Sequence, residues 1–265
     1  MRLKNKVVLV TASTRGIGLA IVKSCAKEGA KVYMAARNLE LADKKANELN
    51  ELGYSVKCVY NDAEKTESYI TMINEVINAE GRIDVLVNNF GTSNPAKDLD
   101  FSNTDMQVFF DTVNTNLKSV FIASKEAVKF MAKNGGGSII NISSVGGAVP
   151  DISQVAYGTS KAAINYLTKL IAVQEAHNKI RCNAVLPGMT ATEAVEQNLS
   201  SEFRDLFLRH IPLARIGAPQ EIADAVVYFA SDESAYTTGQ ILSVSGGFGL
   251  ATPVFAELSD KKSRR

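Results

Sequence analysis

The sequence predicts a single α/β domain, with a doubly wound, seven-stranded parallel sheet flanked by helices. Short apolar, β-branched runs alternate with longer stretches of helical period, as expected for repeated βαβ units. The chain has 265 residues, of which 46% are hydrophobic, enough for one large core. No internal repeat or low-complexity linker interrupts the alternation, so we expect one domain.

Seven apolar runs rich in Val and Ile are predicted strands, at residues 6–10, 31–35, 55–60, 85–88, 138–142, 180–186 and 241–244. Six segments of helical period are predicted helices, at residues 18–28, 39–52, 67–80, 111–133, 157–178 and 219–231. Because helices separate most of the strands, the strands are expected to run parallel, with their carboxyl ends along one edge of the sheet.

Two segments lie outside this alternation. Residues 189–217 follow the sixth strand and carry apolar side chains at roughly helical spacing, namely Val195, Leu199, Phe203, Leu206 and Phe207. We predict that this segment forms a lid over a site at the sheet edge. Residues 248–265 begin apolar and end charged, so the domain is assigned to residues 1–247 and a C-terminal tail to residues 248–265.

Composition excludes several function classes. Lys and Arg total 29 against 28 Asp and Glu, so no net charge favours nucleic acid or an anionic membrane. The N-terminus carries no long apolar stretch, and the three widely spaced cysteines fit free thiols, so a cytoplasmic protein is expected. His177 and His210 are the only histidines, so no metal site is expected, and both are predicted to lie on the surface or to cap a helix.

The segment TASTRGIG at residues 11–18 joins the first strand to the first helix. Backbone amides and the helix N-terminus form a phosphate cradle at such a turn, although a glycine turn can also be purely structural. If it binds a dinucleotide, the contacts are expected from Thr11, Ser13, Thr14, Arg15, Gly16, Ile17 and Gly18.

The second strand ends in Arg37 and Asn38, without the carboxylate that would hydrogen-bond the free ribose 2′-hydroxyl of NAD. The planar guanidinium of Arg37 suits a 2′-phosphate, and Arg15 lies in the phosphate loop. These two arginines predict NADP(H) as cofactor, with Asn38 among its contacts; the alternative is that both are ordinary surface arginines.

Tyr157 and Lys161 are four residues apart, which places them on one face of a helix. A tyrosine has an ordinary pKa of about 10, so a phenol that acts as a general acid or base needs a neighbouring positive charge. Lys161 supplies such a charge. The pair alone is weak evidence, because both residue types are common on helix faces.

Four further segments strengthen the case that Tyr157 and Lys161 are catalytic. They are NNFG at 88–91, NLK at 116–118, SIINISS at 138–144 and PG at 187–188. Together, in this order, they resemble the short-chain dehydrogenase/reductase family over about residues 5 to 247. The resemblance implies that Ser144, rather than Ser143, hydrogen-bonds the substrate oxygen, and that Tyr157 transfers its proton. It implies that Lys161 binds the nicotinamide ribose and lowers the tyrosine pKa, and that Asn116 anchors a water in a proton relay.

The resemblance also implies further cofactor contacts, from Asp62, Ala63, Asn89, Gly91, Pro187, Gly188, Thr190 and Thr192. The chain departs from the family pattern at two positions. Ala12 stands where glycine is usual, and its Cβ is tolerable only if its φ is negative, so a negative φ is expected. Phe90 replaces the alanine of NNAG and is expected to pack beneath the adenosine.

The apolar lid and tail favour a greasy substrate, although these groups could instead cover the body or a subunit interface. Segments at 88–92, 143–153 and 244–247 and the tail resemble the hydroxysteroid dehydrogenase branch of the family. This implies NADP(H)-dependent interconversion of a 7α-hydroxy bile acid and its 7-oxo form, in a homotetramer. One alternative is a 3-oxoacyl-carrier-protein reductase or other carbonyl reductase; the carrier-protein enzyme would favour a basic surface patch near the pocket, and the lid shows no obvious run of Lys or Arg. A second alternative is a non-catalytic NADP-binding regulator, which the intact Ser144, Tyr157, Lys161 and Asn116 disfavour.

Overall fold

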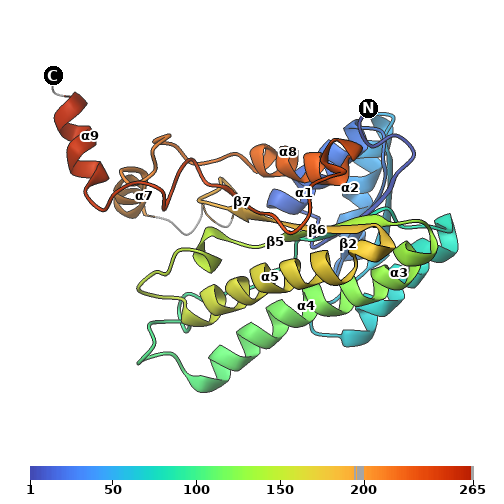
Figure 1. Cartoon of the computed structure of the whole chain (residues 1–265), viewed down its shortest axis with the longest axis horizontal. Coiled ribbons are helices and arrows are strands. Elements are labelled where there is room, and N and C mark those ends of the chain that lie inside the picture. The colour runs from blue at the N-terminus through green and yellow to red at the C-terminus, as the bar shows by residue number, and fades with distance from the viewer. Residues whose placement is uncertain (194, 196–199, 264–265) are drawn as a thin grey trace.

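The computed structural model describes residues 1–193, 195 and 200–263 (Figure 1). Its sheet has seven parallel strands in the order β3-β2-β1-β4-β5-β6-β7. The strands are β1 Val7–Thr11, β2 Lys31–Ala36, β3 Ser55–Tyr60, β4 Val85–Asn88, β5 Gly137–Ile142, β6 Ile180–Pro187 and β7 Ile241–Val244. The strand order reverses between β1 and β4, where doubly wound sheets bind ligands, so the predicted fold class is confirmed.

Helices cover both faces of the sheet (Figure 1). One layer contains α1 Gly16–Lys27, α2 Leu39–Glu51 and α8 Pro219–Ala230, and the other contains α3 Thr66–Glu80, α4 Met106–Lys133 and α5 Val155–Gln174. Short 3-10 helices follow β5 (η1 Val145–Gly147), α5 (η2 Ala176–Asn178) and α8 (η3 Asp232–Ser234). Both faces of β1 are therefore buried, and its five residues are apolar or β-branched throughout.

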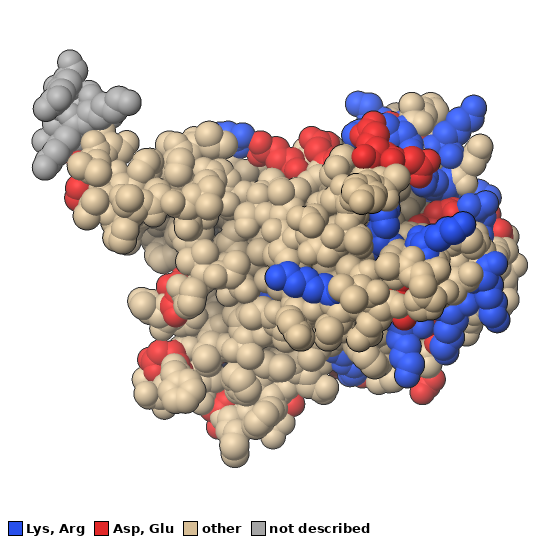
Figure 2. All heavy atoms as spheres, viewed as in Figure 1, with Lys and Arg blue, Asp and Glu red and all other residues tan. Residues whose placement is uncertain are grey.

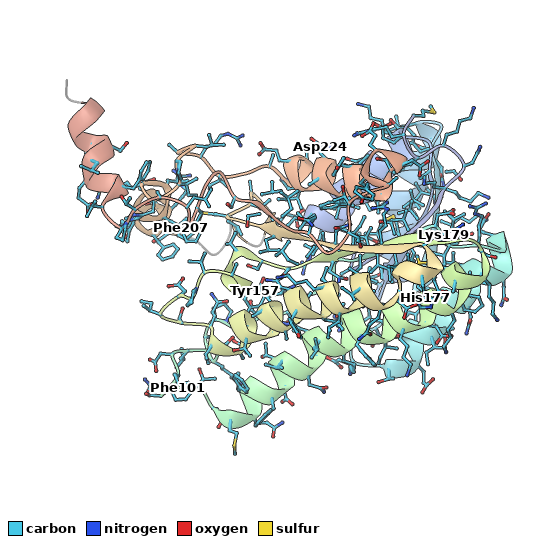
Figure 3. All side chains as sticks on the ribbon, in the orientation of Figure 1. Phe101, Tyr157, His177, Lys179, Phe207 and Asp224 are labelled. Carbon is cyan, nitrogen blue, oxygen red and sulfur yellow. The ribbon has the colours of Figure 1, made fainter. Side chains whose placement is uncertain are left out.

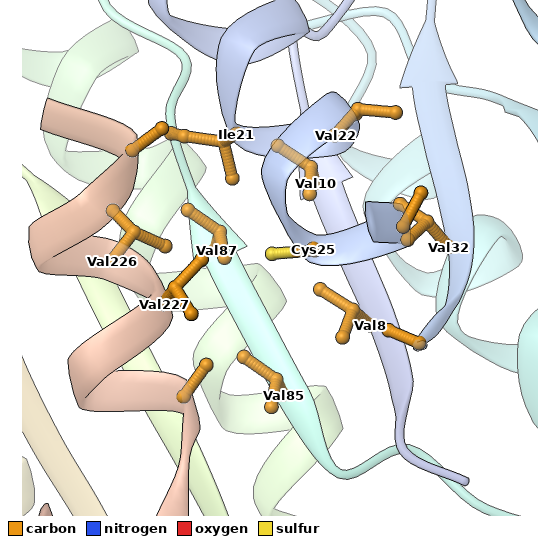
Figure 4. Close-up of a cluster of buried hydrophobic side chains, with 14 of the residues drawn as sticks. Val8, Val10, Ile21, Val22, Cys25, Val32, Val85, Val87, Val226 and Val227 are labelled. Atoms are coloured by element: carbon orange, nitrogen blue, oxygen red, sulfur yellow. The ribbon is translucent and has the colours of Figure 1, made fainter. Parts of the chain in front are cut away.

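Alternate residues of β1 pack on opposite sides of the sheet. Val8 and Val10 contribute to a core with α1 and α8 (Figure 4), whereas Val7 and Leu9 contribute to a second core with α3 and α4. These two cores hold the carboxyl ends of β1, β4, β5 and β6 at one edge, where the predicted site residues follow them.

The predicted strands agree with the observed ones to within one residue at each end. The helix boundaries differ more. Helix α4 begins at Met106 rather than 111, because Asp105 Oδ1 accepts hydrogen bonds from the amides of Gln107 at 2.8 Å and Val108 at 3.3 Å. Helix α5 ends at Gln174 rather than 178, and the separate turn η2 follows it.

The segment 189–217 leaves the sheet edge and returns to it. Its base is closed by hydrogen bonds from Ala191 N to Gly217 O (2.8 Å) and from Gly217 N to Met189 O (2.9 Å). Within it lies α7 Ser201–Leu208; Leu199, which we expected on the apolar face, lies outside the described residues.

The tail forms helix α9 Phe255–Ser263, which lies beside α7 and away from the sheet (Figure 1). An ion pair of 2.6 Å between Arg209 and Asp260 joins the α7 region to α9. Among the described residues, no helix is long and apolar enough to cross a membrane.

Candidate active site

Ser144, Tyr157 and Lys161 meet at the carboxyl edge of the sheet. Ser144 follows β5 and caps η1, its Oγ accepting a hydrogen bond from Gly146 N at 3.1 Å. Tyr157 lies in the first turn of α5 and Lys161 one turn later, with Nζ 5.6 Å from the centre of the Tyr157 ring. The structure thus brings together three residues that the sequence analysis selected.

The electrostatics of this trio depend on burial. Lys161 is only 2% exposed, and its Nζ donates a hydrogen bond to Ile142 O at 3.0 Å. Burial lowers the pKa of Lys161 from 10.5 to about 8. Burial also raises the pKa of the Tyr157 phenol, while its hydrogen bond with Ser144 acts in the opposite direction. A phenol in this position therefore needs the adjacent cation if it is to release a proton near neutral pH.

Ser143 and Ser144 have different surroundings. Ser143 is buried, and its Oγ donates to the carbonyl oxygen of Lys161 at 3.1 Å. Ser144 instead lines the large cavity described below, together with Tyr157. This geometry favours Ser144 as the serine that meets a substrate.

Asn116, on α4, is fully buried and lies next to the same helix. Its Oδ1 accepts a hydrogen bond from Thr92 N at 2.8 Å. Its Nδ2 donates to Thr92 O and to Ser160 Oγ, both at 2.9 Å. Asn116 therefore connects the loop after β4 to α5, and the predicted water relay remains a prediction.

The glycine-containing loop packs against the end of β4. Thr11 Oγ1 accepts hydrogen bonds from Asn89 N at 2.9 Å and Phe90 N at 3.1 Å. Asn89 Nδ2 in turn donates to Thr11 O at 3.1 Å and Ala12 O at 3.0 Å. A Cβ on Gly18 would lie 2.5 Å from Ala12 O, so this position requires glycine.

Our expectation for Ala12 was wrong. Its φ is +51°, in the left-handed region, so the alanine occupies a conformation that glycine adopts without strain. The turn from β1 into α1 requires this backbone conformation whichever residue is present. The hydrogen bond from Asn89 to Ala12 O helps to maintain it.

The loop has the features of a phosphate cradle. Ser13 is fully buried, and among the described residues its Oγ has no hydrogen-bond partner. The N-cap of α1, Arg15, makes no side-chain cap hydrogen bond, which leaves the N-terminal amides of α1 for an anion. A Cβ on Gly91 would lie 2.8 Å from Lys161 Nζ, so glycine keeps the space beside this ammonium open. These residues fit a dinucleotide that passes from the loop to Lys161.

The two arginines expected near the adenosine lie at the ends of neighbouring strands. Arg15 follows β1 and Arg37 follows β2, and these strands pair in parallel. Both side chains are exposed, and neither guanidinium has a hydrogen-bond or ionic partner among the described residues. Asn38 Oδ1 accepts a hydrogen bond from Leu41 N at 3.0 Å, so this side chain caps α2.

The remaining expected cofactor residues border the same edge. Asp62 is buried after β3, with Oδ1 accepting a hydrogen bond from Glu64 N at 3.1 Å, and Ala63 follows it.

The expected nicotinamide-side residues follow β6. Pro187 ends β6, and the next residue, Gly188, donates a hydrogen bond from its amide to Val244 O at 3.0 Å. Thr190 is buried, whereas Thr14 and Ile17 are half-buried in or beside the loop. Thr192 reaches the loop, since a Cβ on Gly16 would lie 3.3 Å from its Cγ2.

A cavity of about 850 Å³ opens above Ser144 and Tyr157. Its apolar lining comes from the η1 region, the loop after β4, α7 and the tail, and includes Phe101, Val145, Val149, Ile152, Phe203, Leu206, Phe207 and Phe248. Phe207 and Phe248 stack with ring centres 4.8 Å apart. Figure 3 shows Phe101, Tyr157 and Phe207 at the same end of the molecule, opposite His177 and Lys179.

The charged lining residues are Asp100 and Asp151; the lining, which belongs wholly to the described part of the chain, also includes His210 but neither Lys nor Arg. In the view of Figure 2 most of the visible Lys and Arg side chains lie on the right, at the end of the molecule away from α7 and α9. Phe101 was not among the residues expected at the site, and His210 was expected only at the surface or at a helix cap. His210 is exposed, as expected, but also borders the cavity.

Comparisons with known proteins agree with this geometry. A family model described as enoyl-(acyl carrier protein) reductase, one of the short-chain dehydrogenase/reductase models, matches residues 11–249. The 7α-hydroxysteroid dehydrogenase of Clostridium sardiniense is 51% identical, over 97% of this chain and 98% of that protein. That of Paraclostridium sordellii is 50% identical, over 98% of each chain.

Among solved structures, a 7α-hydroxysteroid dehydrogenase complexed with NADH and 7-oxo glycochenodeoxycholic acid matches with a TM-score of 0.88 and 32% identity. The match covers 93% of this chain and 95% of that one. The family model, the close relatives and the assembled Ser-Tyr-Lys trio lead to one conclusion: the chain is a nicotinamide-dependent oxidoreductase that belongs to the short-chain dehydrogenase/reductase family.

Proposed function

We propose that this enzyme interconverts a 7α-hydroxy bile acid and its 7-oxo form, with NADP(H) as cofactor. The observation that carries the proposal is that Ser144 and Tyr157 line the same largely apolar cavity of about 850 Å³. This volume suits a ligand of steroid size. The names of the two close relatives support the 7α-hydroxyl as the group that this enzyme oxidises.

Three side chains perform the acid–base part of the reaction. During ketone reduction the Tyr157 hydroxyl donates its proton to the substrate oxygen, to which the Ser144 hydroxyl also donates a hydrogen bond. The ammonium of Lys161, next to the Tyr157 ring, stabilises the phenolate that remains. During oxidation the phenolate removes the proton. Bound NADP(H) supplies or accepts the hydride.

The cofactor assignment rests on the residues at the phosphate loop. Ser13 and the N-terminal amides of α1 would bind the pyrophosphate, and Lys161 would bind the nicotinamide ribose. Arg15 and Arg37, without ionic partners among the described residues, would bind a 2′-phosphate. The solved relative at 32% identity contains NADH, so the two arginines are the features that favour NADP(H) here.

We assign residues 189–217 as the lid over this cavity. Helix α7 contributes Phe203 and Leu206 to the cavity wall, although these side chains are 49% and 55% exposed. A bound steroid would cover such apolar surface, which favours closure of α7 over the substrate. The tail contributes Phe248 to the same wall.

The charged lining residues favour one orientation of a bile acid. Asp100 and Asp151 disfavour a nearby carboxylate, whereas the lining residues of α7, Phe203, Leu206 and Phe207, carry no negative charge. The anionic side chain of the substrate is therefore expected on the α7 side. A 3-oxoacyl-carrier-protein reductase would need cationic groups for its acidic carrier, and the cavity has no Lys or Arg in its lining.

The test compares the rates of NADPH oxidation with a 7-oxo bile acid and with an acetoacetyl thioester. We expect efficient reduction of the steroid and slow reduction of the thioester. Preference for the thioester would support the carrier-protein reductase instead. Binding of NADPH without turnover of either substrate would support a non-catalytic regulator.

We further propose a homotetramer. Helices α4 and α5 expose large apolar side chains, among them Phe110 at 59%, Phe121 at 49%, Tyr166 at 65% and Val173 at 79%. A second copy of the chain is the expected occupant of this surface. Sedimentation equilibrium should give four times the mass of the chain, and the mass of a single chain would reject this assignment.

A further inference from the structure

The catalytic helix α5 begins without an N-cap from its own sequence. Its N-cap position is Gln154, which has a left-handed backbone (φ 59°, ψ 47°) and makes no side-chain cap hydrogen bond. Unsatisfied amides at a buried helix N-terminus are costly, so another group must accept their hydrogen bonds. That group comes from the loop after β4.

Asp98 supplies this cap from 58 residues away in the sequence. Its side chain is fully buried. Oδ1 accepts a hydrogen bond from Ala156 N at 2.9 Å, and Oδ2 accepts one from Tyr157 N, also at 2.9 Å. A carboxylate is favourable here because it faces the positive end of the helix dipole.

The peptide groups on both sides of Tyr157 are fixed by buried side chains. Asp98 accepts from its N–H, and Ser160 Oγ donates to its carbonyl oxygen at 2.7 Å. Ser160 in turn accepts from Asn116 Nδ2 at 2.9 Å. Removing Asp98 would therefore release the N-terminal side of the catalytic residue while the carbonyl side stays in place.

Asp98 also connects the catalytic turn to the substrate wall. Its carbonyl oxygen accepts from Gln154 N at 3.1 Å, and the next carbonyl, of Leu99, accepts from Val155 N at 3.3 Å. The following residues, Asp100 and Phe101, line the cavity. The position of the cavity wall at Asp100 and Phe101 and the position of Tyr157 thus depend on the same hydrogen bonds, those of Asp98 and Leu99 with the start of α5.

We propose that Asp98 is a positioning residue for catalysis, which fixes the Tyr157 hydroxyl relative to Ser144 and the substrate oxygen. Proton transfer needs hydrogen-bond distance, and a misplacement of about 1 Å reduces turnover about 100-fold. The backbone of α5 at Tyr157 is one turn away from Lys161, so the cofactor side of the site should change little.

The test measures kcat, KM and NADPH affinity of Asp98→Ala and Asp98→Asn, with any carbonyl substrate that the wild-type enzyme reduces. Failure of the proposed bile-acid function would appear in the wild type, whereas failure of this proposal would appear in the ratio of variant to wild type. We expect kcat to fall about 100-fold in Asp98→Ala and about tenfold in Asp98→Asn, which keeps one acceptor oxygen. NADPH affinity, followed by nucleotide fluorescence, should stay within about threefold of the wild type.

Asp105→Ala is the matched control. Asp105 caps α4 in the same way, through the amides of Gln107 and Val108, but it is exposed and does not line the cavity. Its loss should lower thermal stability with kcat unchanged within about twofold. If Asp98→Asn keeps the kcat of the wild type, the proposal is overturned, even if Asp98→Ala does not fold. The proposal is also overturned if Asp105→Ala loses as much kcat as Asp98→Ala.

Discussion

Replacing Lys161 by Met should stabilise the fold while it abolishes activity. The folded chain lowers the pKa of this lysine from 10.5 to about 8, because the ammonium is buried and has no carboxylate partner in the described part of the chain. At about 1.4 kcal/mol for each pKa unit, burial of the charge costs about 3 kcal/mol. The variant also loses the hydrogen bond to Ile142 O, which costs about 1 kcal/mol. The net gain is about 2 kcal/mol, or about 4–8 °C in Tm.

The pH dependence has a definite sign. Between pH 8 and 10.5 the unfolded chain binds more protons at this lysine than the folded chain, so the free energy of unfolding of the wild type rises with pH across this window. The advantage of Lys161→Met should therefore be complete below pH 8 and should disappear toward pH 10.5.

Urea unfolding of the cofactor-free protein at several pH values measures this difference. Lys44→Met is the control, because Lys44 lies on helix α2, is exposed, and is outside the surface of α4 and α5 that we propose as a subunit interface. It should change stability by less than about 0.5 kcal/mol. A Lys161→Met variant that is less stable than the wild type at pH 7 would refute the inference that the buried ammonium destabilises the fold.

Three further changes test other parts of the site. Tyr157→Phe should lower kcat by a factor of about 10²–10⁴ and leave the NADPH dissociation constant nearly unchanged; a fully active variant would reject Tyr157 as the acid. Arg37→Asp should lower the ratio of kcat/KM with NADP to that with NAD at least about tenfold, and an unchanged ratio would remove the basis for the NADP(H) assignment. Ala12→Gly should raise the free energy of unfolding by about 1 kcal/mol, since φ is +51° at this position; equal or lower stability in urea would contradict the strain at this turn.

The sequence was sufficient for the sheet, because buried parallel strands appear as continuous apolar runs. For the trio, the four-residue spacing of Tyr157 and Lys161 was only weak evidence. The resemblance to the short-chain dehydrogenase/reductase family was needed to add Ser144 and to give the three residues their roles. The boundary of α4 was missed because Asp105 stands six residues before the segment of clear helical period.

Other features depend on contacts between distant segments. The positive φ of Ala12 arises from the turn into α1 and is accompanied by a hydrogen bond from Asn89. Asp98 caps a helix that begins more than fifty residues later, and no local pattern marks it. Phe101 and His210 meet only at the walls of the cavity. These positions required the tertiary structure.

The most direct test of the proposed function is the identity of the alcohol that the enzyme forms from a 7-oxo bile acid and NADPH, determined by NMR of the product. The apolar cavity lined by Ser144 and Tyr157 predicts that the steroid is reduced, and the names of the two close relatives predict the 7α alcohol as the only product. Formation of the 7β epimer, or no reduction of the 7-oxo group, would contradict the proposal.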